Sequence, residues 1–213
     1  MVPVIDEITA DANTRIVLWH IIEDEVFFKS GLQLDHSELN QLQVIKSELK
    51  RKQWLASRFL IRMIIDSPGF IRLNKLPSGQ PVLSDLDHHV SISHCGYYAA
   101  VIISRTSRVG IDIEVQADRI LAIQHKFIGE QEYQWAGDLH NRLRSLIIWS
   151  AKESIFKWYA LGQVDFRKHI MIYPFESEEQ GSIHALFSNG QVERSLKLNY
   201  RCYHDLVLTW LID

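Results

Sequence analysis

The sequence predicts an α+β fold with two halves of similar size, each combining helices with an antiparallel sheet. Three observations predict this class. Short β-branched, apolar runs are separated by long stretches that carry apolar residues at helical spacing. That succession of helices and strands occurs once in each half of the chain. Asn189-Gly190 lies between two strand-like runs and is a strong hairpin signal. We expect an N-terminal half, 1–104, and a C-terminal half, 105–213, related by a pseudo-twofold duplication, although no clear sequence repeat establishes one.

The N-terminal half is expected to begin with a buried strand at Arg15–Ile22, which is β-branched and apolar. His36 to Asp66 has helical spacing and predicts one or two helices, ended by Ser67-Pro68-Gly69. Three short strands are then expected, and a turn at Cys95-Gly96 joins the last two: Pro81–Leu83, Val90–His94 and Tyr97–Ser104.

The C-terminal half is expected to begin with a strand at Val109–Val115. From Ile120 to Leu161 the pattern is helical, with one well-defined helix at Asn141–Leu161. The Asn189-Gly190 hairpin follows, and Asp205–Ile212 predicts the last strand.

Composition excludes several classes of protein. The 213 residues are 46% hydrophobic and 23% charged, which is ordinary for a globular protein and unlike a disordered, fibrous or disulfide-stapled chain. The net charge of −3 provides no overall basic field for nucleic acid or an anionic membrane. Cys95 and Cys202 lack metal-ligand or redox spacing, no signal peptide is apparent, and no apolar run reaches membrane-spanning length. We therefore expect a cytoplasmic protein.

Two carboxylates interrupt the apolar strand at Val109–Val115. Asp112 and Glu114 are two residues apart, so both project from one face of the strand. Like charges side by side are unfavourable unless a cation lies between them, and an oxygen-only pair suits Mg²⁺. The alternative is a solvated strand end with no ligand.

A second cluster lies on the helix at Asn141–Leu161. Trp149, Glu153 and Lys157 follow one another at four-residue steps and therefore share a stripe, with Lys152 as a further cation. Such a helix offers one carboxylate to a metal and two ammonium groups to phosphate. The alternative is an ordinary surface Glu–Lys pair.

Two upstream segments carry further polar residues. SISHCG, at 91–96, places His94 where a strand enters a turn, and KRKQWLASR, at 50–58, is a basic helical cluster. Each has a structural alternative: a histidine without a catalytic role and a solvated basic face.

These four segments, in this order, resemble the 4′-phosphopantetheinyl transferases of the double-length, surfactin-synthetase type. GIDIE at 110–114 and WSAKESIFK at 149–157 fill the two family patterns, and SISHCG resembles the family's histidine segment. KRKQWLASRFLIR resembles its charged helix. The resemblance implies transfer of the 4′-phosphopantetheine arm of coenzyme A (CoA) to a serine of an apo acyl or peptidyl carrier protein, with release of 3′,5′-ADP.

The resemblance also implies the site residues. Mg²⁺, with Mn²⁺ as an alternative, would be held by Asp112, Glu114 and Glu153. Glu153, Lys157 and Asp112 would be catalytic, with Glu153 also taking the serine proton. CoA would be bound by cations and neighbouring polar groups, namely His94, Lys152, Lys157, Arg51, Arg58, Gln80 and Lys75.

Two positions depart from the family pattern. Gln80 stands where the family has a cation that contacts the 3′-phosphate of CoA, and Cys95 stands where serine or threonine is usual. We expect Lys75, in the turn-rich loop before Gln80, to replace the missing charge.

Two other functions use the same residues. One is a Mg²⁺-dependent phosphohydrolase acting on a CoA-like substrate, and the other is a non-catalytic relative that binds CoA or a carrier protein. By analogy with the double-length group we expect a monomer, and the net charge and the short apolar runs lead us to expect no nucleic-acid or membrane partner.

Overall fold

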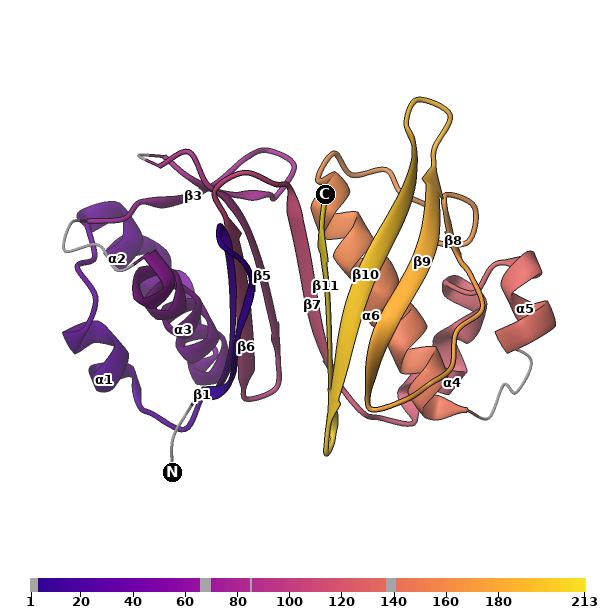
Figure 1. The fold of residues 1–213 in the computed structure, drawn as a ribbon. Helices are drawn as coiled ribbons and strands as arrows, with labels where there is room; N and C mark the ends of the chain where they lie inside the picture. Colours follow the sequence, from indigo (N-terminus) through magenta and orange to yellow (C-terminus); the bar gives the residue numbers. More distant parts are fainter. Residues whose placement is uncertain (1–3, 66–69, 85, 137–140) are drawn as a thin grey trace.

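The computed structural model describes residues 4–65, 70–84, 86–136 and 141–213. It confirms the mixed α+β class with antiparallel sheets. Figure 1 shows the N-terminal elements in indigo and magenta beside the C-terminal elements in orange and yellow, with the two sheets adjacent. Among the described residues no helix is both long and apolar enough to span a membrane.

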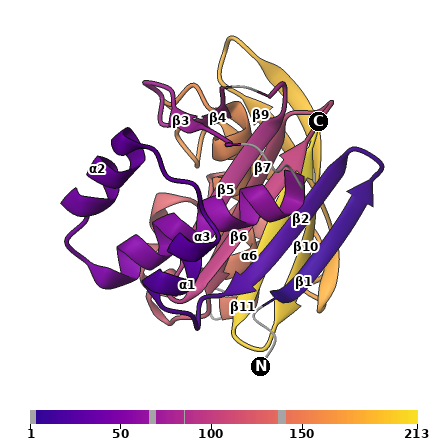
Figure 2. The same ribbon diagram turned by 90° about the vertical axis from the view of Figure 1, so that its left-hand side faces the viewer.

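The N-terminal half contains a four-stranded sheet in the order β1-β2-β6-β5 and a small β3-β4 pair. The longest helix, α3 (Glu48–Ile65), crosses the outer face of the larger sheet, with α1 (Glu25–Ser30) beside it and α2 (His36–Val44) further out, as Figure 2 shows. The elements of this half are β1 (Val4–Asp11), β2 (Thr14–His20), α1 (Glu25–Ser30), α2 (His36–Val44), α3 (Glu48–Ile65), β3 (Leu73–Lys75), β4 (Pro81–Leu83), β5 (His89–Cys95) and β6 (Tyr98–Ser104).

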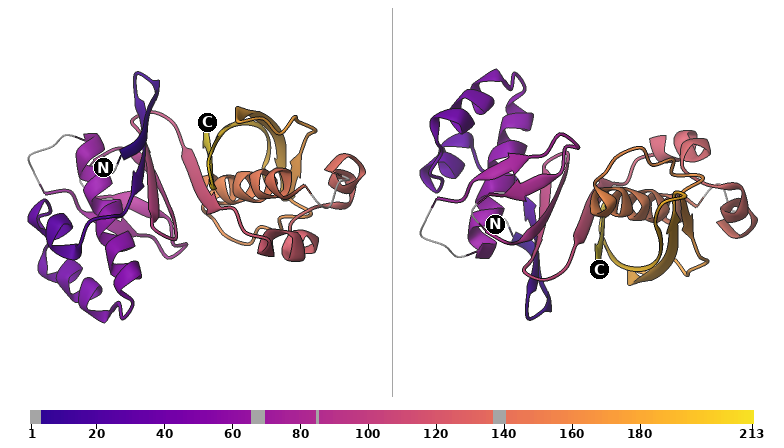
Figure 3. Two further views of the ribbon diagram at one scale, coloured as in Figure 1. Left: turned by 90° about the horizontal axis from the view of Figure 1, so that it is seen from below. Right: turned by 90° about the horizontal axis from the view of Figure 1, so that it is seen from above.

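The C-terminal half contains a five-stranded sheet in the order β7-β11-β10-β9-β8. The sheet curls around the long helix α6, as the two views of Figure 3 show. The elements of this half are β7 (Val109–Val115), α4 (Arg119–Ile123), the 3₁₀ turn η1 (Gln124–Lys126), α5 (Glu130–Ala136), α6 (Arg142–Tyr159), β8 (Ile170–Ile172), β9 (Gln180–Ser188), β10 (Glu193–Tyr203) and β11 (Leu206–Ile212).

Three apolar cores hold the molecule together. One lies between α3 and the N-terminal sheet, and a second lies between α6 and the C-terminal sheet. The third lies between the two sheets and is built by alternate residues of strands whose other residues face the helices. It contains Ile16, Leu18, Ala100, Ile102, Val109, Ile111, Ile113, Leu206, Leu208 and Trp210. The two halves therefore share a buried interface.

Most expected elements are present. The strand at Val109–Val115 has the predicted bounds, and α6 occupies most of the predicted 141–161. The Asn189-Gly190 turn joins β9 to β10. The elements β1, α1, β3 and β8 were not predicted from the sequence, and the predicted helix stop at Ser67-Pro68-Gly69 lies outside the described residues.

The two halves share a strand arrangement. In each half, the last strand of the half lies between two others. One neighbour is the strand that precedes the helices, and the other is the strand that comes just before the last one in sequence, which gives β2-β6-β5 and β7-β11-β10. Both long helices, α3 and α6, have 18 residues. Duplication stays a prediction, as does the division at residue 104, because the halves share a core.

Candidate functional site

The site begins on β7, whose two faces differ in chemistry. Ile111 and Ile113 face the core between the sheets, while Asp112 and Glu114 project from the opposite face, toward α6. Gly110 allows the helix to approach closely, because a Cβ at this position would lie 2.0 Å from the carbonyl oxygen of Ser154. The sequence analysis did not identify this role of the glycine in GIDIE.

Helix α6 presents the second set of side chains. It begins after Asn141, whose side chain accepts a hydrogen bond from the backbone N–H of Arg144. Buried hydroxyls dock it on β11: Ser150 and Ser154 lie 3.0 and 2.7 Å from the hydroxyl of Thr209. This docking turns the stripe of Trp149, Glu153 and Lys157 toward the carboxylates of β7.

Strand β5 joins the site through two serines. Ser91 Oγ and Ser93 Oγ each accept a hydrogen bond, 3.2 Å long, from the backbone N–H of Ile111 and of Ile113. These contacts satisfy donors on the edge of β7 that faces away from β11. The sequence analysis singled out only His94 in this segment, although the alternation of SIS puts both hydroxyls on one face.

Asp112 is held by an ammonium and a hydroxyl group. Its Oδ1 accepts from Lys157 Nζ at 2.8 Å and from Ser93 Oγ at 2.9 Å, and Lys157 also donates to Ser93 at 2.9 Å. Asp112 is only 4% exposed, and its Oδ2 is buried without a hydrogen-bond partner in the described chain. One carboxylate oxygen is therefore left for a ligand.

The other two carboxylates are destabilised in their charged forms. Burial raises the pKa of Glu114, as does the charge of Asp112, although hydrogen bonds from Trp149 and Cys95 oppose the shift. Burial also raises the pKa of Glu153 to about 7, with further upward contributions from Asp112 and Glu114 and a downward one from Lys157. Three carboxylates thus act on one another at one place.

These groups fit a hard divalent cation. Among the described residues, no three His, Cys, Asp or Glu side chains are placed to hold a metal ion as they stand. A bound Mg²⁺ would nevertheless give the unpartnered Oδ2 of Asp112 a partner. It would also offset the mutual repulsion of Asp112, Glu114 and Glu153, and all three residues offer oxygen ligands.

A cleft of about 440 Å³ lies beside this cluster, lined by Lys50, Trp54, Arg58, Lys75 and His94, among others. Burial lowers the pKa of His94, with smaller effects from the charges of Lys50, Lys157 and Lys75. The charge of Lys157, which bonds Asp112, also acts on His94, and this places the cleft near the carboxylates, although the alternation of β5 turns His94 to the face opposite Ser93. Lys75 and Lys50 both line the cleft, and Lys50 was not among the predicted CoA contacts.

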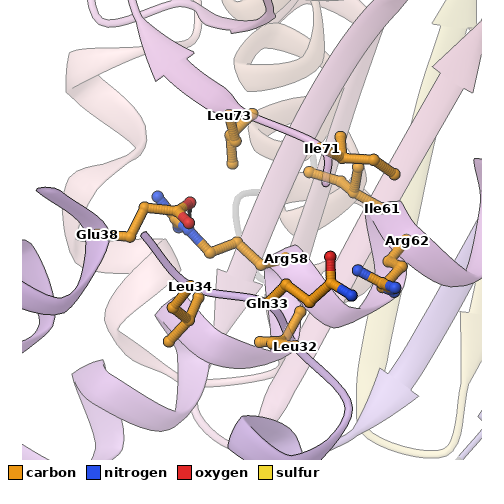
Figure 4. A pocket seen from close by; sticks show the side chains of 9 residues that line it. All are labelled: Leu32, Gln33, Leu34, Glu38, Arg58, Ile61, Arg62, Ile71 and Leu73. Carbon is orange, nitrogen blue, oxygen red and sulfur yellow. Dashed lines mark hydrogen bonds and ion pairs between the residues drawn. The ribbon is translucent and has the colours of Figure 1, made fainter. Parts of the chain in front are cut away.

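Arg58 forms part of the cleft wall. Its Nε donates to Glu38 at 3.0 Å, and its guanidinium carbon lies 3.2 Å from the centre of a Trp54 ring. Figure 4 shows Arg58 pointing toward Glu38, below Leu73, in a second, small pocket that Arg58 also lines. With its side chain 10% exposed, Arg58 supports Trp54 and has little surface for a phosphate.

Three further predicted CoA contacts need correction. Lys152 is fully buried and its ammonium is bound by Glu132 and three backbone carbonyls, so it cannot reach a phosphate. Arg51 bonds Glu25 and the carbonyls of Ile45 and Lys46, and does not line the cleft. Gln80 lies between Gly79 and Pro81, which line the cleft, but is not itself in the lining.

Comparison with known proteins identifies one relationship. The family model of the 4′-phosphopantetheinyl transferase superfamily matches residues 108–209, which run from the start of β7 into β11 and form just under half of the chain. The matched segment contains the carboxylates of β7 and the whole of α6. No curated protein matches the sequence. The match supports phosphopantetheinyl transfer, and hence a transferase, at the level of the superfamily.

Proposed function

We propose that this protein transfers 4′-phosphopantetheine from CoA to a serine hydroxyl of an apo acyl or peptidyl carrier protein and releases 3′,5′-ADP. One observation supports it above the others. Asp112 and Glu114 of β7 and Glu153 and Lys157 of α6 gather at one place, beside a cleft that carries Lys50, Lys75 and His94. Carboxylates for a cation next to cations for phosphates are what a diphosphate substrate requires.

In the proposed complex, the cleft holds the nucleotide end of CoA. Lys75 and Lys50 would bind phosphate groups by charge and His94 would add a hydrogen bond, which places the diphosphate near Lys157. The charge of Lys157 would then stabilise the negative charge that grows on the leaving phosphate. Lys75 takes the part that a cation at position 80 plays in the family.

Asp112, Glu114 and Glu153 would hold Mg²⁺. When bound, the cation neutralises charge on the diphosphate oxygens. The serine oxygen attacks the β-phosphorus, the bond from that phosphorus to the oxygen of 3′,5′-ADP breaks, and the serine proton must leave. Glu153 is our proposed acceptor, because its carboxylate lies among the charges of Asp112, Glu114 and Lys157, close to where the diphosphate would be held.

The remaining proposals concern the setting of the enzyme. The core between the two sheets forms an interface between the two halves of one chain. This supports the double-length type, in which a single chain acts as a monomer. We also propose that the enzyme works in the cytoplasm.

The test is product mass. The protein is incubated with CoA and Mg²⁺, with and without an apo carrier protein. We expect the carrier to gain one phosphopantetheine, with 3′,5′-ADP released only when the carrier is present. Asp112→Asn should abolish the gain, whereas Asp213→Asn, at an exposed position just after β11, should not. Release of 3′,5′-ADP without carrier would indicate a phosphohydrolase, and CoA binding without either product would indicate a non-catalytic relative.

A further inference from the structure

Lys152 and Glu132 form a buried ion pair. Their side chains are 0% and 2% exposed, and Lys152 Nζ lies 2.6 Å from Glu132 Oε2. The ammonium also donates to the carbonyl oxygens of Phe127, Phe166 and Ile170 at 2.7 to 2.9 Å. Lys152 directly precedes Glu153 on α6, so the pair fixes the helix at the candidate site.

The carboxylate end of the pair is equally well bound. Glu132 accepts from the backbone N–H of Gly129 at 2.5 Å and from that of Ile172 at 2.8 Å. One ion pair therefore ties together the 127–129 loop, α5, α6, the segment after α6 and β8. Burial lowers the pKa of Lys152 to about 8 against the opposing charge of Glu132.

Stability alone is a weak reason for such a pair. Burying two charges costs several kcal/mol per ion, and replacing a buried pair by apolar groups often leaves stability unchanged or improves it. A pair that fixes a geometry needed elsewhere is a better explanation, provided that a physical connection to the site exists.

Trp149 provides that connection. The rings of Phe127 and Phe166, whose carbonyl oxygens bind Lys152, pack against Trp149 with centroids 5.2 and 5.6 Å away. The indole Nε1–H of Trp149 then donates to Glu114 Oε1 at 2.9 Å. The backbone that the ion pair holds thus carries the two rings that hold the indole.

We propose that the Glu132–Lys152 pair is a positioning device, which orients Trp149 through Phe127 and Phe166 and thereby fixes the carboxylate of Glu114. The metal-binding part of this inference rests on the proposed function, whereas the hydrogen bond from Trp149 to Glu114 does not. Glu132 and Lys152 touch no substrate.

The first readout is the Trp149 indole N–H signal in a ¹⁵N–¹H NMR spectrum, identified by its loss in Trp149→Phe. We expect Glu132→Gln to shift this signal toward that of an indole without a charged acceptor. Glu130→Gln is the matched control, because Glu130 lies on the same helix but is exposed. That control should leave the signal in place.

The second readout is metal binding, measured with Mn²⁺ by electron paramagnetic resonance in the presence of CoA. Glu132→Gln should weaken Mn²⁺ binding about tenfold, which corresponds to about 1.4 kcal/mol. If the pair acts through Trp149, Glu132→Gln should weaken binding little further in a chain that already carries Trp149→Phe.

The inference is overturned if Glu132→Gln lowers the melting temperature but leaves both the indole signal and Mn²⁺ binding unchanged, since the pair would then be structural only. Should that variant fail to fold, Glu132→Asp, which keeps the charge and withdraws it by one methylene, is measured in the same way. A wild-type protein that binds no Mn²⁺ contradicts the proposed function, and the indole signal still decides this inference.

Discussion

At the scale of single residues, Glu153 is a carboxylate whose pKa is raised by burial and by neighbouring negative charges. Its pKa of about 7 in the folded protein compares with an ordinary value of 4.5. Between these two pH values the folded state binds more protons than the unfolded state, so the stability of the metal-free protein falls as the pH rises. Above pH 7 the full cost of the buried charge remains.

Glu153→Gln should remove this cost. In excess chelator, the melting temperature of the variant should exceed that of wild type by more at pH 8 than at pH 5. The difference should be about 2–4 °C for each ~1 kcal/mol regained. Thermal unfolding at the two pH values measures it. Glu130→Gln, at an exposed position, should show no such gain. Parallel pH profiles for wild type and Glu153→Gln would show that burial of Glu153 does not act on stability.

Lys75 carries a second prediction about single residues. It lies in the cleft with His94, so Lys75→Ala should lower the preference for CoA over 3′-dephospho-CoA by about tenfold, the effect of one lost charged hydrogen bond. Gln80→Lys should change that preference little. The measurement is kcat/KM for both substrates. The prediction is contradicted if Gln80→Lys strongly raises the preference for CoA while Lys75→Ala leaves it unchanged. Lys75 would then not supply the charge that is missing at position 80.

Residues differ in how far sequence can place them. Asp112 and Glu114 were correctly placed on one face of β7, because the two-residue period of a strand needs only local information. Lys152 was not, because its acceptors come from Glu132, Phe166 and Ile170, which the fold assembles from separate segments. A lysine beside a site and a lysine buried behind it have the same local pattern.

At the scale of elements, β5 and β7 meet through side chains and not through a backbone ladder. Ser91→Ala would leave the N–H of Ile111 without its acceptor in a buried place, which should cost about 1–3 kcal/mol. Urea unfolding measures the loss, and Ser37→Ala, at an exposed position of α2, is the control. An unchanged unfolding midpoint would show that the contact of Ser91 adds nothing.

Ser93→Ala tests whether the contact between β5 and β7 also supports the metal site. It should destabilise the fold by a similar amount and also weaken Mn²⁺ binding, because Ser93 touches both Asp112 and Lys157. Ser91→Ala should leave Mn²⁺ binding intact. Equal metal affinity in both variants would mean that Ser93 serves only the backbone.

Elements with strong local patterns could be predicted, and marginal ones could not. The strand at Val109–Val115 is apolar on one face and buried from Val109 to Ile113, and α6 has helical spacing throughout. Strand β1 is half exposed and pairs only with β2, so its sequence, VIDEITAD, carries no core-facing run that marks a strand. Helix α1 has six residues, too few for a periodic signal.

At the scale of the whole molecule, the first strand is fastened to the C-terminal half. Asp6 Oδ2 accepts from Arg201 at 2.8 Å and from the hydroxyl of Tyr203 at 2.6 Å. Burial raises the pKa of Tyr203, and so does the adjacent charge of Asp6. These contacts join β1 to β10 across almost the full length of the chain.

Asp6→Ala should therefore destabilise both halves together by about 1–3 kcal/mol, the usual effect of losing hydrogen bonds to a charged group. Tyr203→Phe should cost less, and the double variant should fall short of the sum, because the two residues share one contact. Denaturant unfolding of the four proteins measures this coupling. Strict additivity would show that Tyr203 and Asp6 do not act as a pair.

The apolar layer between the two sheets has a consequence for a severed chain. A cut between Thr106 and Ser107, in the loop from β6 to β7, would leave each piece with one side of that layer open to water. Ile102 on one piece and Leu208 on the other would then have lost their neighbours, and neither piece could cover the loss by itself. When the two pieces are made separately and mixed, they should associate through this layer, and the proposed transferase activity should return by complementation.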